Sequence, residues 1–132
     1  MGEIPAGTRL ERNLLVTSEV AIDFLGNEEA RVLSTPHLVA FLEMASRDAV
    51  KGLLDPGQDT VGTRIDLRHL AATPVGMHVR LSAEVTAVED RRITFRIEAH
   101  DEREKIGEGT HERFIIHIGR FATRLSAKKA GL

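Results

Sequence analysis

The sequence of 132 residues contains no cysteine. This absence excludes a disulfide framework, a thiolate nucleophile and a metal site with thiolate ligands, and it fits the reducing cytoplasm, where we expect the protein to work. An excess of charge of one sign is also lacking, since the formal net charge is -2 at pH 7. Because the chain has no global basic field, nucleic acid is not expected as a partner.

Long apolar runs are missing too. The N-terminal stretch MGEIPAGTRLERN lacks the apolar core of a secretory signal, and no run approaches the length of a membrane span. Hydrophobic residues make up 42% of the chain and charged residues 29%, as in an ordinary soluble globular domain. No repeat, low-complexity tract or linker divides the sequence. We therefore expect a single cytoplasmic domain over residues 1–132, without a membrane partner.

Several motifs that hold metals or nucleotides do not occur. The six histidines include no pair at the HExxH spacing of zinc ligands, and the DxDxDG pattern of calcium loops is missing. GxGxxG, the P-loop and the Gly-x-Ser-x-Gly turn are absent as well. We therefore expect no bound metal and no glycine loop that cradles a nucleotide.

The stretch STPHLVAFLEMASRDAV, residues 34–50, has its apolar residues at helical spacing. A hydroxyl residue followed by Pro36 is typical of a helix start, with Thr35 as the N-cap and the proline in the first helical position. The Pro-Gly pair within residues 54–59 ends the helix. These signals predict one long helix from Pro36 to about Leu53.

Four segments after this helix alternate apolar and polar residues with a period of two, which is typical of strands that bury one face. They are VGTRIDLRHL (61–70), HVRLSAEVTAV (78–88), RITFRIEAH (92–100) and IGEGTHERFIIHI (106–118). Upstream, we expect one or two short strands over residues 10–24 and a polar loop over residues 25–33. Short polar turns join the last three segments, which predicts an antiparallel meander.

The helix and the strands must bury their apolar faces against each other. The predicted fold class is therefore α+β, with an antiparallel β-sheet wrapped around one long central α-helix. Such a sheet has exposed edges and only one helix to cover it. Both features favour a two-fold homodimer that extends or covers the sheet.

Glu43 lies in the densest part of the apolar helix sequence, between Leu42 and Met44. A carboxylate among apolar side chains is costly unless a charged or hydrogen-bonding partner compensates it. In one interpretation the helix turns Glu43 to the surface or pairs it with Arg47, four residues on. In the other, Glu43 lines a cleft and acts as a nucleophile or general base. The helix alone favours neither interpretation.

His69 and Thr35 are further candidates for such a cleft. His69 ends a strand on the same face as Leu67 and should point toward the helix, although a lone histidine on an apolar face is more often part of the core. Thr35 lies at the helix N-terminus, whose N–H groups suit a developing oxyanion. It is about 12 Å along the helix axis from Glu43, so a substrate or a symmetry-related chain would have to connect them.

Gly62 and Arg113 carry weaker signals. Strict alternation puts Gly62 on the face opposite His69, where it marks either a close approach of a backbone or ligand or a simple bulge. Arg113 falls on the face opposite Phe114, and solvation is its default interpretation. The same default applies to the basic residues near the C-terminus, which are Arg120, Arg124, Lys128 and Lys129.

Together these stretches resemble the hot-dog-fold thioesterases of the fluoroacetyl-coenzyme A thioesterase type, over roughly residues 5–125. The resemblance rests on residues 34–50, 61–77, 81–101 and 106–118. Its most specific motifs are His-x-Ala-Ala-Thr-Pro-x-Gly at 69–76 and Gly-Thr-His-Glu-Arg at 109–113. The resemblance implies a hot-dog fold and hydrolysis of a small acyl-coenzyme A, with coenzyme A as part of the substrate and no separate cofactor.

The same resemblance assigns roles to the candidate residues. It implies a catalytic group of Thr35, Glu43 and His69, with Glu43 as either nucleophile or general base. Gly62 would contribute to the oxyanion or water site, and Arg113 would contact the coenzyme A side of the substrate. The spacings within the family motif, from the threonine to the glutamate and from the glycine to the histidine, are both intact. The acyl site would lie at the interface of a homodimer.

One segment departs from the family. The member specific for fluoroacetyl-coenzyme A has phenylalanines before the helix that cover the acyl group, whereas residues 25–33, LGNEEARVL, contain no aromatic residue. This departure argues against fluoroacetate specificity. Two other functions stay open on the same evidence: an acyl-thioester dehydratase or hydratase, and a protein that binds acyl-coenzyme A without turnover.

Overall fold

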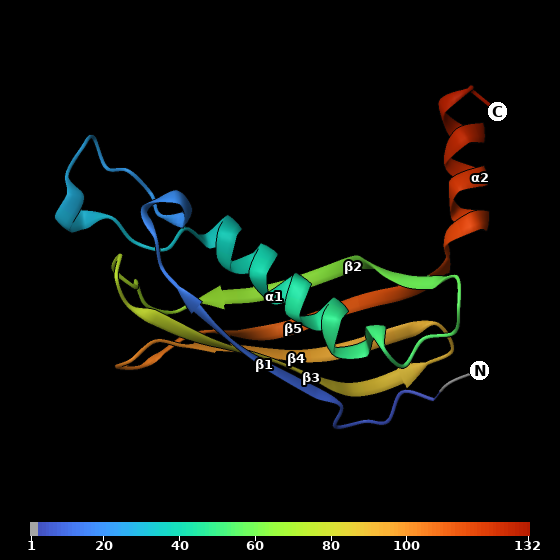
Figure 1. Ribbon diagram of the computed structural model, residues 1–132, viewed down its shortest axis with the longest axis horizontal. Coiled ribbons are helices and arrows are strands. Elements are labelled where there is room, and N and C mark those ends of the chain that lie inside the picture. Colours follow the sequence, from blue (N-terminus) through green and yellow to red (C-terminus); the bar gives the residue numbers. More distant parts are fainter. Residues whose placement is uncertain (1–2) are drawn as a thin grey trace.

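A computed structural model describes residues 3–132, so the first two residues of the expected domain lie outside the description (Figure 1). Five strands and two α-helices make up the fold. They are β1 (Arg9–Leu15), α1 (Thr35–Lys51), β2 (Gln58–His69), β3 (His78–Glu89), β4 (Arg92–His100), β5 (Lys105–His117) and α2 (Ile118–Lys129). Two short 3-10 turns, η1 (Ser18–Val20) and η2 (Glu28–Ala30), lie between β1 and α1.

The five strands form one sheet in the order β1-β3-β4-β5-β2, and all neighbours are antiparallel. The predicted meander of β3, β4 and β5 is confirmed. Helix α1 crosses one face of this sheet, as Figure 1 shows. The predicted antiparallel sheet wrapped around one long helix is therefore confirmed, with β1 and β2 as its edge strands.

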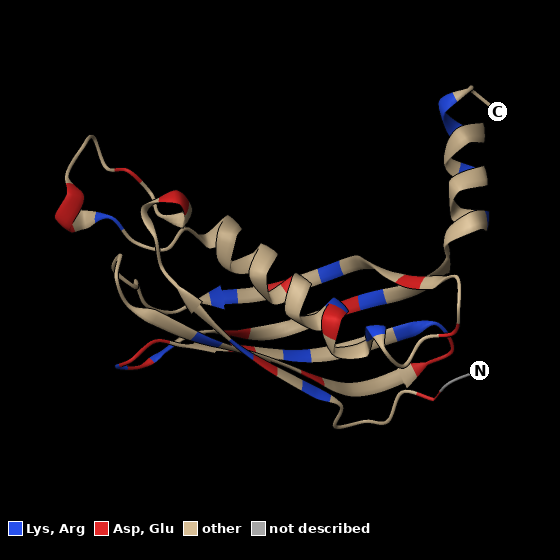
Figure 2. Cartoon of the chain, viewed as in Figure 1, with Lys and Arg blue, Asp and Glu red and all other residues tan. Residues whose placement is uncertain are grey.

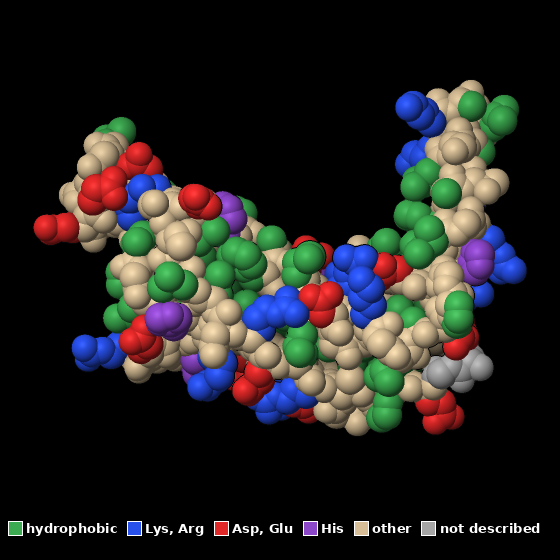
Figure 3. All heavy atoms as spheres, viewed as in Figure 1, with side chains coloured by type: hydrophobic (Ala, Val, Ile, Leu, Met, Phe, Trp, Pro, Cys, Tyr) green, Lys and Arg blue, Asp and Glu red, His purple; other side chains and the backbone are tan. Residues whose placement is uncertain are grey.

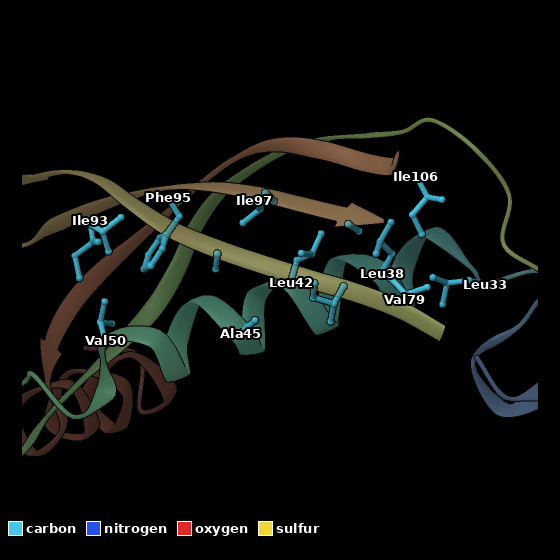
Figure 4. Close-up of a cluster of buried hydrophobic side chains, with 14 of the residues drawn as sticks. Leu33, Leu38, Leu42, Ala45, Val50, Val79, Ile93, Phe95, Ile97 and Ile106 are labelled. Atoms are coloured by element: carbon cyan, nitrogen blue, oxygen red, sulfur yellow. The ribbon is translucent and has the colours of Figure 1, made fainter. Parts of the chain in front are cut away.

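The core lies between α1 and the sheet (Figure 4). Leu38, Leu42, Ala45 and Val50 recur every three to five residues, so they share one face of α1 and are fully buried there. The sheet contributes buried side chains from three strands, among them Val79, Ile93, Phe95, Ile97 and Ile106. Burial of each large apolar side chain stabilises the fold by about 1.5–3 kcal/mol, which fixes α1 on the sheet and with it every residue that α1 carries.

The start of α1 differs from the prediction in one respect that matters for the site. Ser34, not Thr35, is the N-cap, because its hydroxyl accepts a hydrogen bond from the His37 N–H at 3.3 Å. Thr35 is instead the first residue of α1, followed by Pro36. The Thr35 hydroxyl is therefore left to bind another partner. The helix ends at Lys51, two residues before the predicted end.

The two ends of the chain flank this core. The expectation of one or two short strands over residues 10–24 is confirmed by the single strand β1, which is followed by η1. The basic residues near the C-terminus are exposed as expected, but they lie on a helix, α2, that was not predicted. His117 caps this helix by accepting the Arg120 N–H at 3.4 Å. In Figure 1, α2 stands away from the sheet at one end of the molecule, and the segment containing η2 projects at the other.

Strand β2 contains a bulge between Gly62 and Arg64. Its register with β5 shifts there, so Thr63 has no partner in the ladder. Because a bulge adds one residue, positions on either side of it exchange faces relative to strict alternation. Gly62 and His69 therefore both face α1, although they are seven residues apart. The prediction that they lie on opposite faces was wrong for this reason.

The faces of β5 are likewise reversed from the prediction. His111 and Arg113 are buried, whereas Phe114 is 40% exposed on the outer face. Alternation anchored on Phe114 gave the wrong face because Ile115 and Ile116 are both buried in succession near the end of the strand. The prediction that Arg113 is solvated was therefore wrong.

Candidate functional site

Thr35 and His69 meet where α1 begins and β2 ends. The Thr35 hydroxyl oxygen lies 2.7 Å from His69 Nδ1. The other ring nitrogen, Nε2, is buried and has no hydrogen-bond partner among residues 3–132. Burial lowers the pKa of His69, which favours the neutral ring. The pair therefore presents a neutral imidazole, held through one nitrogen and with the other available to accept or donate a proton.

A small cavity of about 310 Å³ lies beside this pair. Besides Thr35 and His69 it is lined by apolar side chains from two loops, which are Ile22, Val32, Leu33, Leu70, Ala71 and Ala72. Three of these, Ile22, Leu70 and Ala72, are exposed. The surroundings of the imidazole are thus apolar on one side and open to solvent on the other.

Glu43 lies at the margin of the buried face of α1 rather than inside it. It follows the buried Leu42 and is therefore turned about 100° around the helix from the core. Its side chain is 39% exposed and reaches across to β5, where Oε2 lies 3.5 Å from Arg113 Nη1. The alternative pairing with Arg47 is wrong, since that guanidinium binds Asp59 at 2.5 and 3.0 Å. This pair lowers the pKa of Asp59 to about 2.

Arg113 is held almost completely by the chain itself. Its Nε donates to the Thr60 hydroxyl at 2.8 Å, and its Nη2 donates to the Thr60 carbonyl at 2.9 Å. Its Nη1 contacts both His111 Nε2, at 3.3 Å, and the Glu43 carboxylate. Burial lowers the pKa of Arg113, and the charge of Glu43 opposes that shift. The guanidinium is therefore fixed in place and presents one face to Glu43.

His111 is a second buried histidine, and its partners determine its tautomer. Nδ1 lies 2.8 Å from the Arg64 carbonyl, which can only accept, so Nδ1 carries the proton. Nε2 is then an acceptor for Arg113 Nη1. Burial lowers the pKa of His111, in keeping with a neutral ring. Sequence reasoning missed both His111 and Thr60 as supports of Arg113; the motif at 109–113 contained the signal for His111 but not its role.

Gly62 lies directly against the Glu43 carboxylate. A Cβ atom added to Gly62 would be 2.6 Å from Glu43 Oε2, 3.3 Å from His111 Cε1 and 3.4 Å from Arg113 Nη1. Such contacts are too close for any side chain to be accepted without movement of the carboxylate. Of the two interpretations of this glycine, close approach and bulge, the structure shows both: the bulge turns Gly62 inward, and Glu43 fills the space beside it.

The Glu43 group lines a cleft of about 630 Å³, together with Arg113, Gly62 and Thr60. The rim of this cleft includes the exposed apolar side chains of Met44 and Ile118. It shares no lining residue with the cavity beside Thr35 and His69. Within one chain the five predicted residues therefore form two half-sites: Thr35 with His69, and Glu43 with Gly62 and Arg113.

No cluster of three or more potential metal ligands occurs in the described part of the chain. Within the same residues, no helix is long and apolar enough to cross a membrane. The two half-sites contain the carboxylate of Glu43 and the guanidinium of Arg113 on one side, and the imidazole of His69 and the hydroxyl of Thr35 on the other.

Comparison with known proteins assigns the chain to a family. The model of the fluoroacetyl-CoA-specific thioesterase family matches residues 16–118. The chain belongs to this family. Among fluoroacetyl-CoA-specific thioesterases, the fluoroacetyl-CoA thioesterase of Streptantibioticus cattleyicolor is 41% identical to it over 101 residues, which are 76% of this chain and 73% of that protein.

Solved structures agree with this assignment. The fluoroacetyl-CoA thioesterase FlK superposes with a TM-score of 0.85 at 34% identity, over 96% of this chain and 98% of that one; a variant of FlK has been solved in complex with fluoroacetate and CoA. A thioesterase superfamily member from Thermus thermophilus superposes with a TM-score of 0.88 at 28% identity, over 98% and 96% of the two chains. These matches confirm the hot-dog fold.

Proposed function

We propose that this protein is an acyl-coenzyme A thioesterase that hydrolyses a small acyl-CoA to the free acid and coenzyme A. The observation that carries the proposal is the Glu43 carboxylate held against the backbone of Gly62 in an open cleft of a thioesterase-family chain. A carboxylate on a helix, next to exposed backbone in an open cleft, is suited to attack on a thioester carbonyl.

Glu43 acts on the carbonyl carbon in one of two ways. It attacks the carbon itself to give a mixed anhydride, which water then hydrolyses, or it removes a proton from water as the water attacks. In both cases the C–S bond breaks, water supplies the new oxygen of the acid, and the thiolate takes up a proton to leave as the thiol. Arg113 is a positioning residue, because its fixed guanidinium holds the carboxylate in place. Its contact with the coenzyme A side of the substrate stays a prediction.

The Thr35–His69 pair supplies the proton transfer. A neutral imidazole with one nitrogen bound to Thr35 can accept a proton from water at the other and pass it to the leaving thiolate. The Thr35 N–H at the positive end of α1 and the backbone at Gly62 stabilise the negative charge that develops on the carbonyl oxygen. Thr35 fixes the ring, which is possible because Ser34 has taken over the N-cap.

The two half-sites come together in a homodimer. β2 is an edge strand of the sheet, and antiparallel pairing of two copies about the middle of β2 would bring Gly62 and Glu43 of one copy toward Thr35 and His69 of the other. Exposed apolar side chains rim both half-sites, which are Ile22 and Leu70 on one and Met44 and Ile118 on the other. Figure 3 shows hydrophobic side chains along the concave face between α2 and the projecting loop, where a second copy would bury them.

The loop before α1 argues against specificity for a fluoroacetyl group. Residues 25–33 contain no aromatic side chain to close over it, and Leu25 is fully exposed in the structure. The chain works as one domain without a separate cofactor, coenzyme A being part of the substrate. Its location in the cytoplasm stays a prediction from the sequence.

Release of free thiol from a panel of short, branched and aryl acyl-CoA substrates tests the proposal. Turnover on at least one substrate is expected for the wild type, with losses of about 10² to 10⁴ in Glu43→Gln and His69→Gln. Glu11→Gln and His78→Gln change the same residue types on exposed surface and should retain full activity. Binding of these thioesters without thiol release would contradict hydrolysis. Double-bond formation or hydration would instead assign a dehydratase or hydratase.

A further inference from the structure

A third cavity, distinct from the two that hold the half-sites, lies at the base of α2. It has a volume of about 480 Å³ and is lined by Arg91, Phe114, Arg120, Thr123 and Arg124, among others. The three arginines come from separate parts of the chain: the turn between β3 and β4, and two successive turns of α2. The three guanidinium groups therefore come together only because of the position of α2. None of them takes part in the chemical steps of the proposed hydrolysis.

Positive charge in this cavity is uncompensated. None of the three guanidiniums lies within 4.0 Å of a carboxylate of the described residues, whereas the arginines of the neighbouring strand do, as in the pair Arg92–Glu89 at 3.2 Å. α2 itself contains four Lys or Arg residues and no Asp or Glu, which Figure 2 shows as blue segments without red. Guanidinium groups free of carboxylates are suited to binding phosphate oxygens in a bidentate manner.

An aromatic ring borders the same cavity. Phe114 is 40% exposed on the outer face of β5, so part of its ring stays open to solvent beside the cavity. A second ring, that of Phe121, lies 5.8 Å below the Arg124 guanidinium. A nucleobase can stack on an exposed aromatic ring or on a guanidinium plane, and its phosphates can bind the free arginines. The exposed ring and the unpaired arginines together indicate that the ligand is a phosphorylated nucleotide rather than a simple anion.

The cavity adjoins the cleft that holds Glu43. Ile116 lines both, and Ile118, at the first residue of α2, lines the cleft. A ligand that enters the cleft and continues past these two isoleucines reaches Arg120 and Arg124. A single extended ligand could therefore place its thioester carbonyl beside Glu43 and its other end in the cationic cavity.

We propose that the cavity at the base of α2 binds the phosphorylated nucleotide end of coenzyme A, with Arg91, Arg120 and Arg124 on its phosphates and Phe114 against its base. This inference rests on the proposed thioesterase function, since it supplies the nucleotide half of that substrate's site. It also gives α2, which contributes nothing to the core, a role in substrate binding.

The test compares two double variants of α2. Arg120→Gln/Arg124→Gln removes two charges from the cavity, and Lys128→Gln/Lys129→Gln removes two charges from the same helix outside it. The first readout is kcat/KM on an acyl-CoA divided by kcat/KM on the same acyl group carried by pantetheine, which lacks the nucleotide. The second is calorimetric binding of adenosine 3′,5′-bisphosphate and, separately, of inorganic pyrophosphate to the full-length protein. Circular dichroism checks that both variants are folded.

The arginine variant is expected to lower the acyl-CoA to acyl-pantetheine ratio by about tenfold or more, and to weaken adenosine bisphosphate binding by a similar factor, because charged hydrogen bonds of this kind are each worth that much. In the lysine variant, both the substrate ratio and the binding of adenosine bisphosphate should stay near the wild-type values. An unchanged ratio, equal effects of the two variants, or pyrophosphate binding as tight as the nucleotide would overturn the inference. If neither thioester is hydrolysed the proposed function fails, while the calorimetric comparison still decides the cavity.

Discussion

The carboxylate of Glu43 occupies the space that a side chain at Gly62 would need: a Cβ on Gly62 would lie 2.6 Å from Glu43 Oε2. α1 and β2 are therefore in contact through a glutamate and a glycine at the centre of the cleft. Three features of the chain produce this contact: the buried face of α1, which sets the angle of Glu43; the bulge in β2, which turns Gly62 inward; and Arg113, which holds the carboxylate.

Gly62→Ala is expected to lower kcat/KM by about 10²-fold, because a new methyl group displaces the carboxylate by the order of 1 Å from its reactive position. The fold should survive, since the contacted atom is the flexible end of a side chain. Gly52→Ala is the control, as a Cβ at Gly52 meets nothing within 4 Å. Thioesterase assays and thermal unfolding of both variants check this. Full activity in Gly62→Ala would show that the position of Glu43 is not critical.

Thr60→Val removes the hydroxyl that accepts from Arg113 Nε while keeping the shape of the side chain. A buried guanidinium N–H left without a partner should cost about 1–3 kcal/mol of unfolding free energy, and release of Arg113 should lower kcat more than it raises KM. Thr63→Val, on the same strand but with an exposed hydroxyl, serves as the control. Urea unfolding and steady-state kinetics measure both effects. An unaltered kcat in Thr60→Val would argue against Arg113 as a positioning residue.

Because burial lowers the pKa of His69, its NMR titration midpoint should lie below the ordinary value of 6.5. The unfolded chain then takes up this proton first as the pH falls, so the folded state loses stability below about pH 6.5. His69→Gln should lose less stability than the wild type between pH 7.5 and pH 5.5. A midpoint above 6.5 would mean that the ring is held as a cation, and the proposed proton transfer would have to begin from imidazolium.

The Arg47–Asp59 pair borders the cleft that holds Glu43. It predicts a different dependence of stability on pH. The hydrogen bond from Arg47 lowers the pKa of Asp59 from 3.8 to about 2. Its stabilising contribution is thus fully present above about pH 5 and is lost as the pH falls from about 4 toward 2. Asp59→Asn and Arg47→Gln should each be less stable than wild type at pH 6, with a difference that shrinks at pH 3. Denaturant unfolding at both pH values measures these stabilities. An equal difference between variant and wild type at pH 6 and pH 3 would contradict the lowered pKa of Asp59.

Much of the fold could be predicted from periodicity. The apolar positions of α1 and the meander β3–β5 each have one buried face, so their sequence patterns are unambiguous. The pattern failed where local geometry changes the period: a bulge at Thr63 inverts the faces of β2, and two successive buried isoleucines obscure the inner face of β5. A bulge leaves no clear mark in a single sequence. α2 was missed because it packs on nothing that would impose an apolar stripe.

The catalytic roles of Thr35, Glu43 and His69 stay predictions. The sequence indicated that Thr35 and Glu43 lie too far apart to touch, but not that His69 lies with Thr35 in one cavity while Glu43 lines another. Of the supports of Arg113, His111 is two residues away on the same strand, whereas Thr60 is 53 residues away and becomes a neighbour only through the pairing of β2 with β5. Contacts of that kind depend on strand register, which the sequence does not specify alone.

The most direct measurement is activity of mixed dimers of Glu43→Gln and His69→Gln, co-expressed with two different tags and purified through both. If each site combines Glu43 of one copy with His69 of the other, every mixed dimer contains one site with both native residues. Such dimers should recover about half of the wild-type activity, although each variant alone is inactive. Activity no higher than that of the two single variants would contradict the claim that the half-sites of two copies form one active site.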